Sequence, residues 1–209
     1  MSIFDLLFLL SLTGVLIGAG VVTYRFARGR NVTAATLLRR LLVFVGGYTL
    51  LLIAVSVAEP QREIPIGTAQ CFDEWCVTVQ GVVRQAAIGE VRAKGTFYVV
   101  TLSLSSRAKR RRQSEPDAIV YLLDGAGRRF DVSESAQRGL VAEGIAGERL
   151  DAFLDPGAAV LSRVAFDVPN DAAHVALVKA SRSRFPFRWI VGDPQSWLHR
   201  PTVVPLNLP

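Results

Sequence analysis

The sequence predicts two amino-terminal transmembrane α-helices followed by an all-β sandwich domain, and two observations support this fold class. The stretch at 41–58 reads LLVFVGGYTLLLIAVSVA without a charged residue and is long enough to cross a bilayer as a helix. Beyond residue 59, short runs of β-branched and aromatic residues are separated by Gly, Pro, Asp and Asn, as in a two-sheet sandwich. The expected parts are a transmembrane helix at 1–24, a basic cytoplasmic loop at 25–40, a second transmembrane helix at 41–58 and an extracytoplasmic domain at 59–209.

The first apolar stretch is uncharged from Leu6 to Tyr24 and follows a single acid, Asp5. Because a secretory signal peptide carries a basic leading region, we expect this stretch to remain as an anchor. A cleaved signal peptide, with the second stretch as the single anchor, is the alternative. The stretch at 25–40 holds arginines and no acid: Arg25, Arg28, Arg30, Arg39 and Arg40. Short arginine-rich loops stay in the cytoplasm, so the domain is expected outside it.

Small residues mark both apolar stretches. Gly14 and Gly18 form a G-x-x-x-G pattern in the first, and Gly46 and Gly47 are adjacent in the second. Such positions let two helix backbones approach closely, so a helical hairpin is expected. A homo-oligomer formed through the same face is a second option, and glycine is also simply frequent in membrane helices.

The net charge of the 209-residue chain is +6, but residues 60–209 hold 19 of the 24 basic and 16 of the 18 acidic residues, so this part is only +3. The basic balance is therefore mainly a topology signal, and nucleic acid is not an expected partner. The part after the second apolar stretch is long enough for one domain with its own core. No spacing of the histidines His174 and His199 suggests a metal, and no cofactor is expected.

Seven strands are predicted in the domain, near 75–83, 96–105, 118–123, 129–132, 158–168, 175–180 and 187–191. The second and fifth alternate clearly between apolar and polar residues, so one face of each should lie in the core. The predicted core residues are Tyr98, Val100, Leu102 and Leu104 in the second strand, and Val160, Val164, Phe166 and Val168 in the fifth.

The turn residues agree with these strands. The sequence DGAG at 124–127 should link two strands as a hairpin, and Asp155-Pro156-Gly157 suits a type II turn. The stretch at 133–150 has no strand pattern and is expected to be a long connection between the sheets with one helical turn.

Several of these segments carry a family resemblance: FYVVTL at 97–102, the 124–125 turn followed by Arg129-Phe130, LDPG at 154–157, and VAFDVP at 164–169 with Ala176-Leu177 after it. Over roughly residues 72–191 the sequence resembles bacterial membrane-anchored extracytoplasmic immunoglobulin-like domains of unknown function. The resemblance implies an immunoglobulin-like sandwich in the cell envelope. It implies no activity, because that family has no shared catalytic motif.

The two cysteines, Cys71 and Cys76, lie just after the second apolar stretch. In an extended strand they would be about 16 Å apart, so a disulfide requires a turn at 72–75. We expect this disulfide because the domain is placed outside the cytoplasm. A redox pair is disfavoured because the spacing is not Cys-x-x-Cys, and two cysteines without a nearby histidine are a poor metal site.

The densest charge in the chain lies at 107–112, between two predicted strands: Arg107, Lys109, Arg110, Arg111 and Arg112. These cations form either a solvated hairpin loop or a contact for an anionic surface, such as phosphate-bearing envelope polymers or lipid headgroups.

A hydrolase triad can be drawn near the carboxyl terminus from Asp193, Ser196 and His199. There is no Gly-x-Ser-x-Gly elbow or other nucleophile context, so we interpret this stretch instead as a helical turn capped by Asp193-Pro194, with Trp197 closing the sandwich.

The sequence thus favours a multi-pass membrane protein of the bacterial envelope that acts as an extracytoplasmic binding or interaction module, without catalysis. Its expected partners are the membrane, through two spans, and an envelope protein or anionic polymer, contacted by the loop at 107–112 or through a sheet edge. Two alternatives stay open: an assembly subunit whose helices pack in a larger membrane complex, and an envelope hydrolase.

Overall fold

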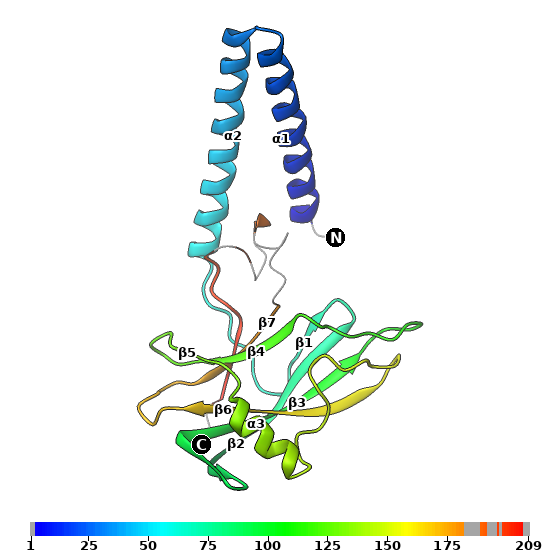
Figure 1. The fold of residues 1–209 in the computed structure, drawn as a ribbon, viewed down its shortest axis with the longest axis vertical. Coiled ribbons are helices and arrows are strands. Elements are labelled where there is room, and N and C mark those ends of the chain that lie inside the picture. The colour runs from blue at the N-terminus through cyan, green and yellow to red at the C-terminus, as the bar shows by residue number, and fades with distance from the viewer. Residues whose placement is uncertain (1–2, 182–188, 192–195, 197, 207–209) are drawn as a thin grey trace. The chain divides into compact units, whose positions relative to one another are not determined.

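A computed structural model describes residues 3–181, 189–191, 196 and 198–206 (Figure 1). The chain divides into two compact units. One comprises Met1–Pro60 with Arg184–Arg200, and the other Gln61–Ser183 with Pro201–Pro209. The expected domain at 59–209 differs from this division at Glu59–Pro60 and at Arg184–Arg200, which both group with the amino-terminal helices.

The first unit contains two long helices, α1 (Ile3–Ala27) and α2 (Asn31–Ala58). At 1.5 Å per residue they are about 37 and 42 Å long, more than the roughly 30 Å hydrocarbon core of a bilayer. By length and composition both helices are able to cross a membrane. The expected loop at 25–40 is wrong as local structure, because only Arg28–Arg30 separate the helices. Arginine is a good helix former, so the end of an apolar stretch does not mark the end of its helix.

The second unit is a β-sandwich of two antiparallel four-stranded sheets. One sheet has the order β1-β2-β3-β6 and the other β5-β4-β7-β8 (Figure 1). The strands are β1 (Ala69–Phe72), β2 (Trp75–Ile88), β3 (Val91–Ser106), β4 (Ala118–Leu123), β5 (Arg129–Phe130), β6 (Ala159–Val168), β7 (Ala176–Ser181) and β8 (Val203–Pro205). The predicted fold class of two apolar helices followed by a β-sandwich is confirmed at this level.

Six of the seven predicted strands correspond to β2 through β7. The seventh, at 187–191, falls partly outside the described residues, and its described part, Trp189–Val191, is not a strand. Two short edge strands, β1 and β8, were not predicted. Strand β8 contains Pro205, which cannot donate a ladder hydrogen bond and is tolerated because the strand lies at an edge.

The predicted core is confirmed. The side chains of Tyr98, Val100, Leu102 and Leu104 are buried in one cluster together with Val164, Phe166 and Val168, and Val160 packs against it. Residues from the opposite sheet complete the cluster, among them Val120, Leu122 and Leu177.

Part of β3 is buried on both of its faces. Helix α3 (Glu134–Ala142) covers the outer side of the β1-β2-β3-β6 sheet, where Ala136 and Leu140 pack with Phe97 and Val99. Residues 97–100 are therefore all buried, which explains why FYVV does not alternate there. The helix, nine residues long, replaces the single helical turn expected at 133–150.

Both predicted turns are present. Strands β4 and β5 pair across the 124–127 turn. At 155–157, the Ala158 amide donates to the Asp155 carbonyl at 3.0 Å, and Gly157 has a φ of +74°, as a type II turn requires.

Leu102 offers a test of the core. It is fully buried between its register partners on β2 and β6, so Leu102→Ala should lower the free energy of unfolding of the full-length protein by about 2–5 kcal/mol. Urea unfolding followed by tryptophan fluorescence measures this, because Trp75 lies in the same core. The control Val83→Ala, at a side chain that is 58% exposed, should change it by less than about 0.5 kcal/mol. Equal effects of the two changes would contradict the core assignment.

Candidate functional site

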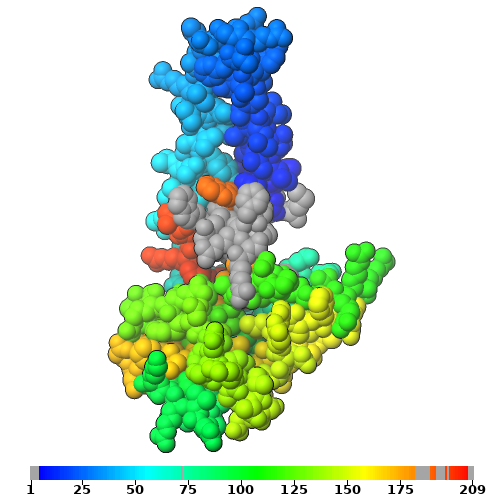
Figure 2. All heavy atoms as spheres, in the orientation of Figure 1, coloured from blue at the N-terminus to red at the C-terminus, as the bar shows by residue number. Residues whose placement is uncertain are grey.

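The loop from Arg107 to Asp117, which joins β3 to β4, carries the predicted basic cluster. Because β3 and β4 belong to different sheets, the loop is a sheet-to-sheet crossing and not a hairpin. It projects from the sandwich as the green lobe at the right of Figures 1 and 2.

Both ends of this loop are attached to the turn that the disulfide closes. The Arg107 amide donates to the carbonyl of Glu74 at 2.7 Å, and Gln113 Nε2 donates to the Glu74 carboxylate at 2.9 Å. The predicted Cys71–Cys76 disulfide is present across β1 and β2, with the two residues in register and a turn between them. The disulfide hairpin therefore fixes the base of the basic loop.

The far side of the loop is attached to the segment before β6. Gln113 and Leu154 exchange two backbone hydrogen bonds, at 2.9 and 2.7 Å. Arg112 forms an ion pair with Asp155 at 2.9 Å, and its guanidinium lies 5.9 Å from the ring centre of Phe153. The charge of Arg112 is thus partly neutralised by Asp155, although both side chains of the ion pair are largely exposed.

The other four cations of the cluster are exposed. Within the described part of the chain, none of them has a carboxylate within ion-pair distance: Arg107, Lys109, Arg110 and Arg111. The neighbouring Ala108 and Ser106 are buried, and the Ala108 amide donates to the Ser106 hydroxyl. The arrangement is a loop with fixed ends that presents uncompensated positive charge to the solvent, as a site for an anion requires.

In the β1-β2-β3-β6 sheet, the edge formed by β6 is covered by other segments of the chain. The Ser133 amide donates to Ala165 at 2.9 Å, and the Glu148 amide donates to Leu161 at 2.8 Å. Gly147 bridges to Ser162 in the same place. A partner strand has no free ladder along this part of β6, which weakens the expectation of binding through that edge.

The two predicted helix-packing glycines differ in their surroundings. A Cβ atom on Gly18 would lie 3.1 Å from a methyl group of Leu41, so Gly18 faces α2. Around Gly14, Gly46 and Gly47, a Cβ atom would meet nothing within 4 Å among the described residues. The G-x-x-x-G pattern therefore contributes one glycine to the α1–α2 contact.

Of the triad that can be drawn on paper, Asp193 lies outside the described residues, as do Pro194 and Trp197. The buried hydroxyl of Ser196 shares a hydrogen bond of 2.9 Å with Ser56 on α2. The Nδ1 atom of His199 is buried without a hydrogen-bond partner among the described residues. The hydroxyl of Tyr48 donates to the Trp189 carbonyl at 2.6 Å, so this segment is attached to α2 at two positions.

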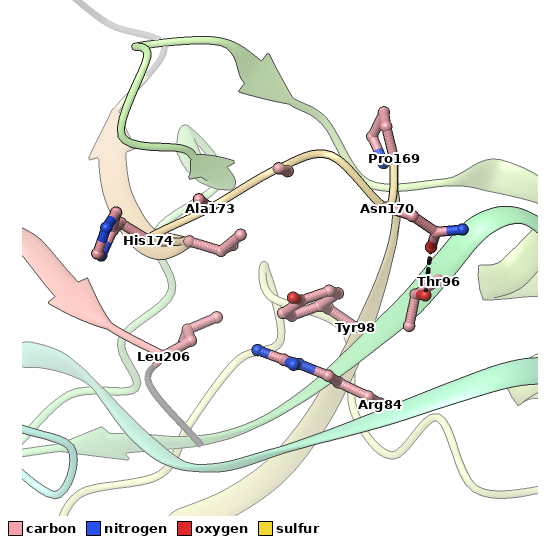
Figure 3. A pocket seen from close by; sticks show the side chains of 10 residues that line it. Arg84, Thr96, Tyr98, Pro169, Asn170, Ala173, His174 and Leu206 are labelled. Atoms are coloured by element: carbon pink, nitrogen blue, oxygen red, sulfur yellow. Dashed lines mark hydrogen bonds between the residues drawn. The ribbon is translucent and has the colours of Figure 1, made fainter. Parts of the chain in front are cut away.

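A pocket that the sequence did not predict lies beside the middle of β3, at Thr96 and Tyr98. It has a volume of about 210 Å³ and lies among β2, β3, the β6–β7 loop and the end of β8 (Figure 3). Its polar lining residues include Arg84, Tyr98, Asn170 and His174. These positions are scattered along the chain, and no local motif connects them.

Elsewhere in the described residues, no group of His, Cys, Asp and Glu side chains is arranged to hold a metal ion.

Lys179 on β7 lies on the inner face of its sheet, because its register partner Val120 belongs to the core. Burial lowers the pKa of its ammonium group to about 8, although the nearby Glu115 carboxylate acts in the opposite direction. Burial, followed by the charge of Asp117, also raises the pKa of Glu115. This pair lies where the basic loop enters β4.

No protein-family model and no curated protein sequence matches the chain. Among solved structures, it is similar to an uncharacterized beta-sandwich protein from Clostridium difficile 630, with a TM-score of 0.43 and 13% identity over 71% of this chain and 96% of that one. A secreted protein from Mycobacterium tuberculosis matches with a TM-score of 0.39 and 12% identity over 57% of this chain and 90% of that one. The yjhA protein from Bacillus subtilis matches with a TM-score of 0.39 and 15% identity over 68% of this chain and 98% of that one.

The lowered pKa of Lys179 predicts a stability that depends on pH. Below pH 8 the amine is charged in both the folded and unfolded states, so the full cost of burying it is present. Between about pH 8 and 10.5 the folded protein loses this proton while the unfolded chain retains it, so this group makes stability rise with pH.

Lys179→Met should remove that rise and increase the free energy of unfolding at pH 7 by about 1–3 kcal/mol, since one pKa unit corresponds to about 1.4 kcal/mol. Urea unfolding of the full-length protein at pH 7 and pH 10 measures both effects. Lys94→Met, at an exposed lysine, is the matched control, and its free energy of unfolding should depend on pH as that of the original protein does. A Lys179→Met variant with the same pH profile as the original protein would contradict the buried placement of this amine.

Proposed function

We propose that this protein is a membrane-anchored, extracytoplasmic interaction module of the cell envelope whose β3–β4 loop binds phosphate-bearing polyanions. The observation that carries the proposal is the group of four exposed, uncompensated cations on a loop with both ends fixed. The module needs no catalytic residue and no cofactor for this role.

Membrane anchoring is supported by the surface of the two helices. Leu10 and Leu16 on α1 and Leu50 on α2 are each at least 64% exposed, and many other large apolar side chains of both helices are exposed as well. An apolar surface of this extent is unfavourable in water and is satisfied by lipid.

The orientation is supported by charge. The five arginines at 25–40 occupy the end of α1, the short link and the first part of α2, without an acidic residue among them. This end is proposed to stay in the cytoplasm, which places the sandwich outside. The Cys71–Cys76 disulfide is consistent with that side, because disulfides persist in oxidising compartments.

We further assign the sandwich to the immunoglobulin-like type. Strands β2, β3 and β6 are adjacent in one sheet, and β5, β4, β7 and β8 are adjacent in the other. This order corresponds to strands A, B and E, and to C′, C, F and G, of immunoglobulin domains. The stretch that contains α3 then stands where strand D would be, and the basic loop is the B–C connection.

The topology is tested by labelling Cys71 and Cys76 in intact cells with a membrane-impermeant thiol reagent, before and after reduction. Labelling is expected only after reduction. In a background with both cysteines changed to serine, Val32→Cys supplies a thiol at a side chain that is 82% exposed on the proposed cytoplasmic side. It should be labelled only after lysis. Labelling of Val32→Cys in intact cells, with the native cysteines protected, would reverse the topology.

The binding role is tested with the full-length protein in zwitterionic nanodiscs. Changing Arg110, Arg111 and Lys109 to serine should weaken binding of polyphosphate by about a hundredfold, from about 1 kcal/mol per cation. Binding by the original protein should fall as salt is raised, because exposed charges are screened. Surface plasmon resonance at low and high salt measures both effects.

A matched variant with Arg92, Lys94 and Arg138 changed to serine loses the same charge from other exposed positions and should bind as the original does. A second arm replaces polyphosphate with vesicles containing phosphatidylglycerol, which distinguishes a polymer from a lipid surface as the source of phosphate. Equal losses in the two triple variants would refute the assignment to this loop.

A further inference from the structure

The pocket beside the middle of β3 forms a second site, separate from the basic loop. Tyr98 and Arg107 are nine positions apart on the strand, which corresponds to roughly 30 Å. Figure 3 shows Arg84 running beneath the Tyr98 ring with its guanidinium end toward Leu206, and the Tyr98 hydroxyl turned to the same side. His174 lies across the hollow from Asn170 and Thr96.

The pairing of β2 with β3 holds Arg84 in place. Arg84 and Tyr98 are register partners, and the guanidinium carbon lies 4.9 Å from the ring centre. Stacking on a ring occupies the face of the guanidinium and leaves its N–H edge available for hydrogen bonds. In the described part of the chain, this side chain has no carboxylate partner.

The acidic residues nearest in the sequence to this wall are already engaged. The Asp167 carboxylate accepts the amides of Lys94 and Gly95 at 3.0 and 3.1 Å. Asp171 and Asp124 both accept from Arg128, at 2.8 and 2.6 Å. No acid lines the pocket, so its charge comes from Arg84.

The β6–β7 loop, which forms the second wall, is held by three contacts. Thr96 Oγ1 donates to Asn170 Oδ1 at 2.8 Å, Asp171 pairs with Arg128, and the Gly125 amide donates to the Ala173 carbonyl at 2.8 Å. Burial opposes ionisation of Asp124, but hydrogen bonds from Arg128 outweigh it and hold the pKa of this carboxyl below its usual value. The wall is therefore preorganised, which reduces the entropic cost of binding.

The free polar groups around the hollow are suited to donate hydrogen bonds. Arg84 offers N–H groups only, the Tyr98 hydroxyl has no hydrogen-bond partner in the described chain, and the His174 imidazole carries an N–H in either protonation state. His174 also has a φ of +54°, a conformation uncommon for residues other than glycine. The Arg84 guanidinium beside these donors matches a group with one negative charge and two acceptor oxygens.

We propose that this pocket binds a carboxylate, with Arg84 as its ion-pair partner and Tyr98 and His174 as further donors. At about 210 Å³ the hollow is smaller than sites for drug-sized ligands, and it admits a small organic acid or one acidic side chain of a partner. The two sources share the same chemistry.

The test uses the full-length protein in detergent and two probes of matched shape, N-acetyl-aspartate methylamide and N-acetyl-asparagine methylamide. Saturation-transfer NMR should show millimolar binding of the aspartate probe and none of the asparagine probe. Arg84→Gln should weaken binding of the aspartate probe at least tenfold, as expected for loss of a charge-assisted hydrogen bond. Arg92→Gln, on the same hairpin outside the pocket, is the matched control and should leave binding unchanged.

Two variants separate binding from folding. Tyr98→Phe removes only the hydroxyl, and His174→Asn removes the imidazole while keeping a residue that tolerates positive φ. Both variants should bind the aspartate probe more weakly, while their melting temperatures stay near that of the original protein. Equal binding of the two probes, or of the aspartate probe to Arg84→Gln, would overturn the proposal, as would equal affinity for inorganic phosphate.

A third comparison distinguishes the source of the carboxylate. Succinate that binds as tightly as an extended acidic decapeptide assigns a free organic acid. A decapeptide that binds more than tenfold more tightly, and loses this advantage in Arg84→Gln, assigns an acidic side chain of a protein partner. Loss of polyphosphate binding at the basic loop leaves these outcomes unaffected, because the two sites share no residue.

Discussion

The packing of β3 is the constraint on which the rest of the sandwich depends. One face of this strand, with Val100, Leu102 and Leu104, is buried against the β5-β4-β7-β8 sheet, while Phe97 and Val99 on the other face are buried against α3. Strand β3 also pairs with β2 on one side and β6 on the other. Apolar burial on both faces and hydrogen bonds on both edges make it the most completely enclosed element of the domain.

This rigid strand connects two surfaces of different chemistry. Its carboxyl end leads into the basic loop, whose base is held by Glu74 from the disulfide hairpin. At the middle of the strand, Tyr98 stacks with Arg84 at the pocket. Both proposed sites are built on backbone held by hydrogen bonds, so their side chains are positioned in advance of any binding. The basic loop presents several exposed cations, whereas the pocket places Arg84 beside hydroxyl and imidazole donors, and we therefore propose different anions for the two sites.

The two apolar helices and the sandwich are linked by more than one crossing of the chain. Besides the connection after α2, the stretch Arg184–Arg200 belongs to the unit of the helices, although it lies in sequence between β7 and β8. Hydrogen bonds from Tyr48 and Ser56 attach Trp189 and Ser196 to α2. These hydrogen bonds satisfy two polar side chains of an otherwise apolar helix.

The sequence by itself determined the two apolar helices, six of the strands, the core face of β3 and β6, the type II turn at 155–157 and the disulfide. These features follow from local rules of apolar length, alternation with period two and turn chemistry, which need no knowledge of distant residues. Tertiary structure decided the edge strands β1 and β8, which form by pairing with β2 and β7. The start of α2 at Asn31 escapes prediction for a different reason, because the end of an apolar stretch does not mark the end of its helix. Tertiary structure also brought together Arg84, Tyr98, Asn170 and His174 from three separate segments of the chain, because sheet pairing and loop anchoring are long-range contacts that local sequence does not encode.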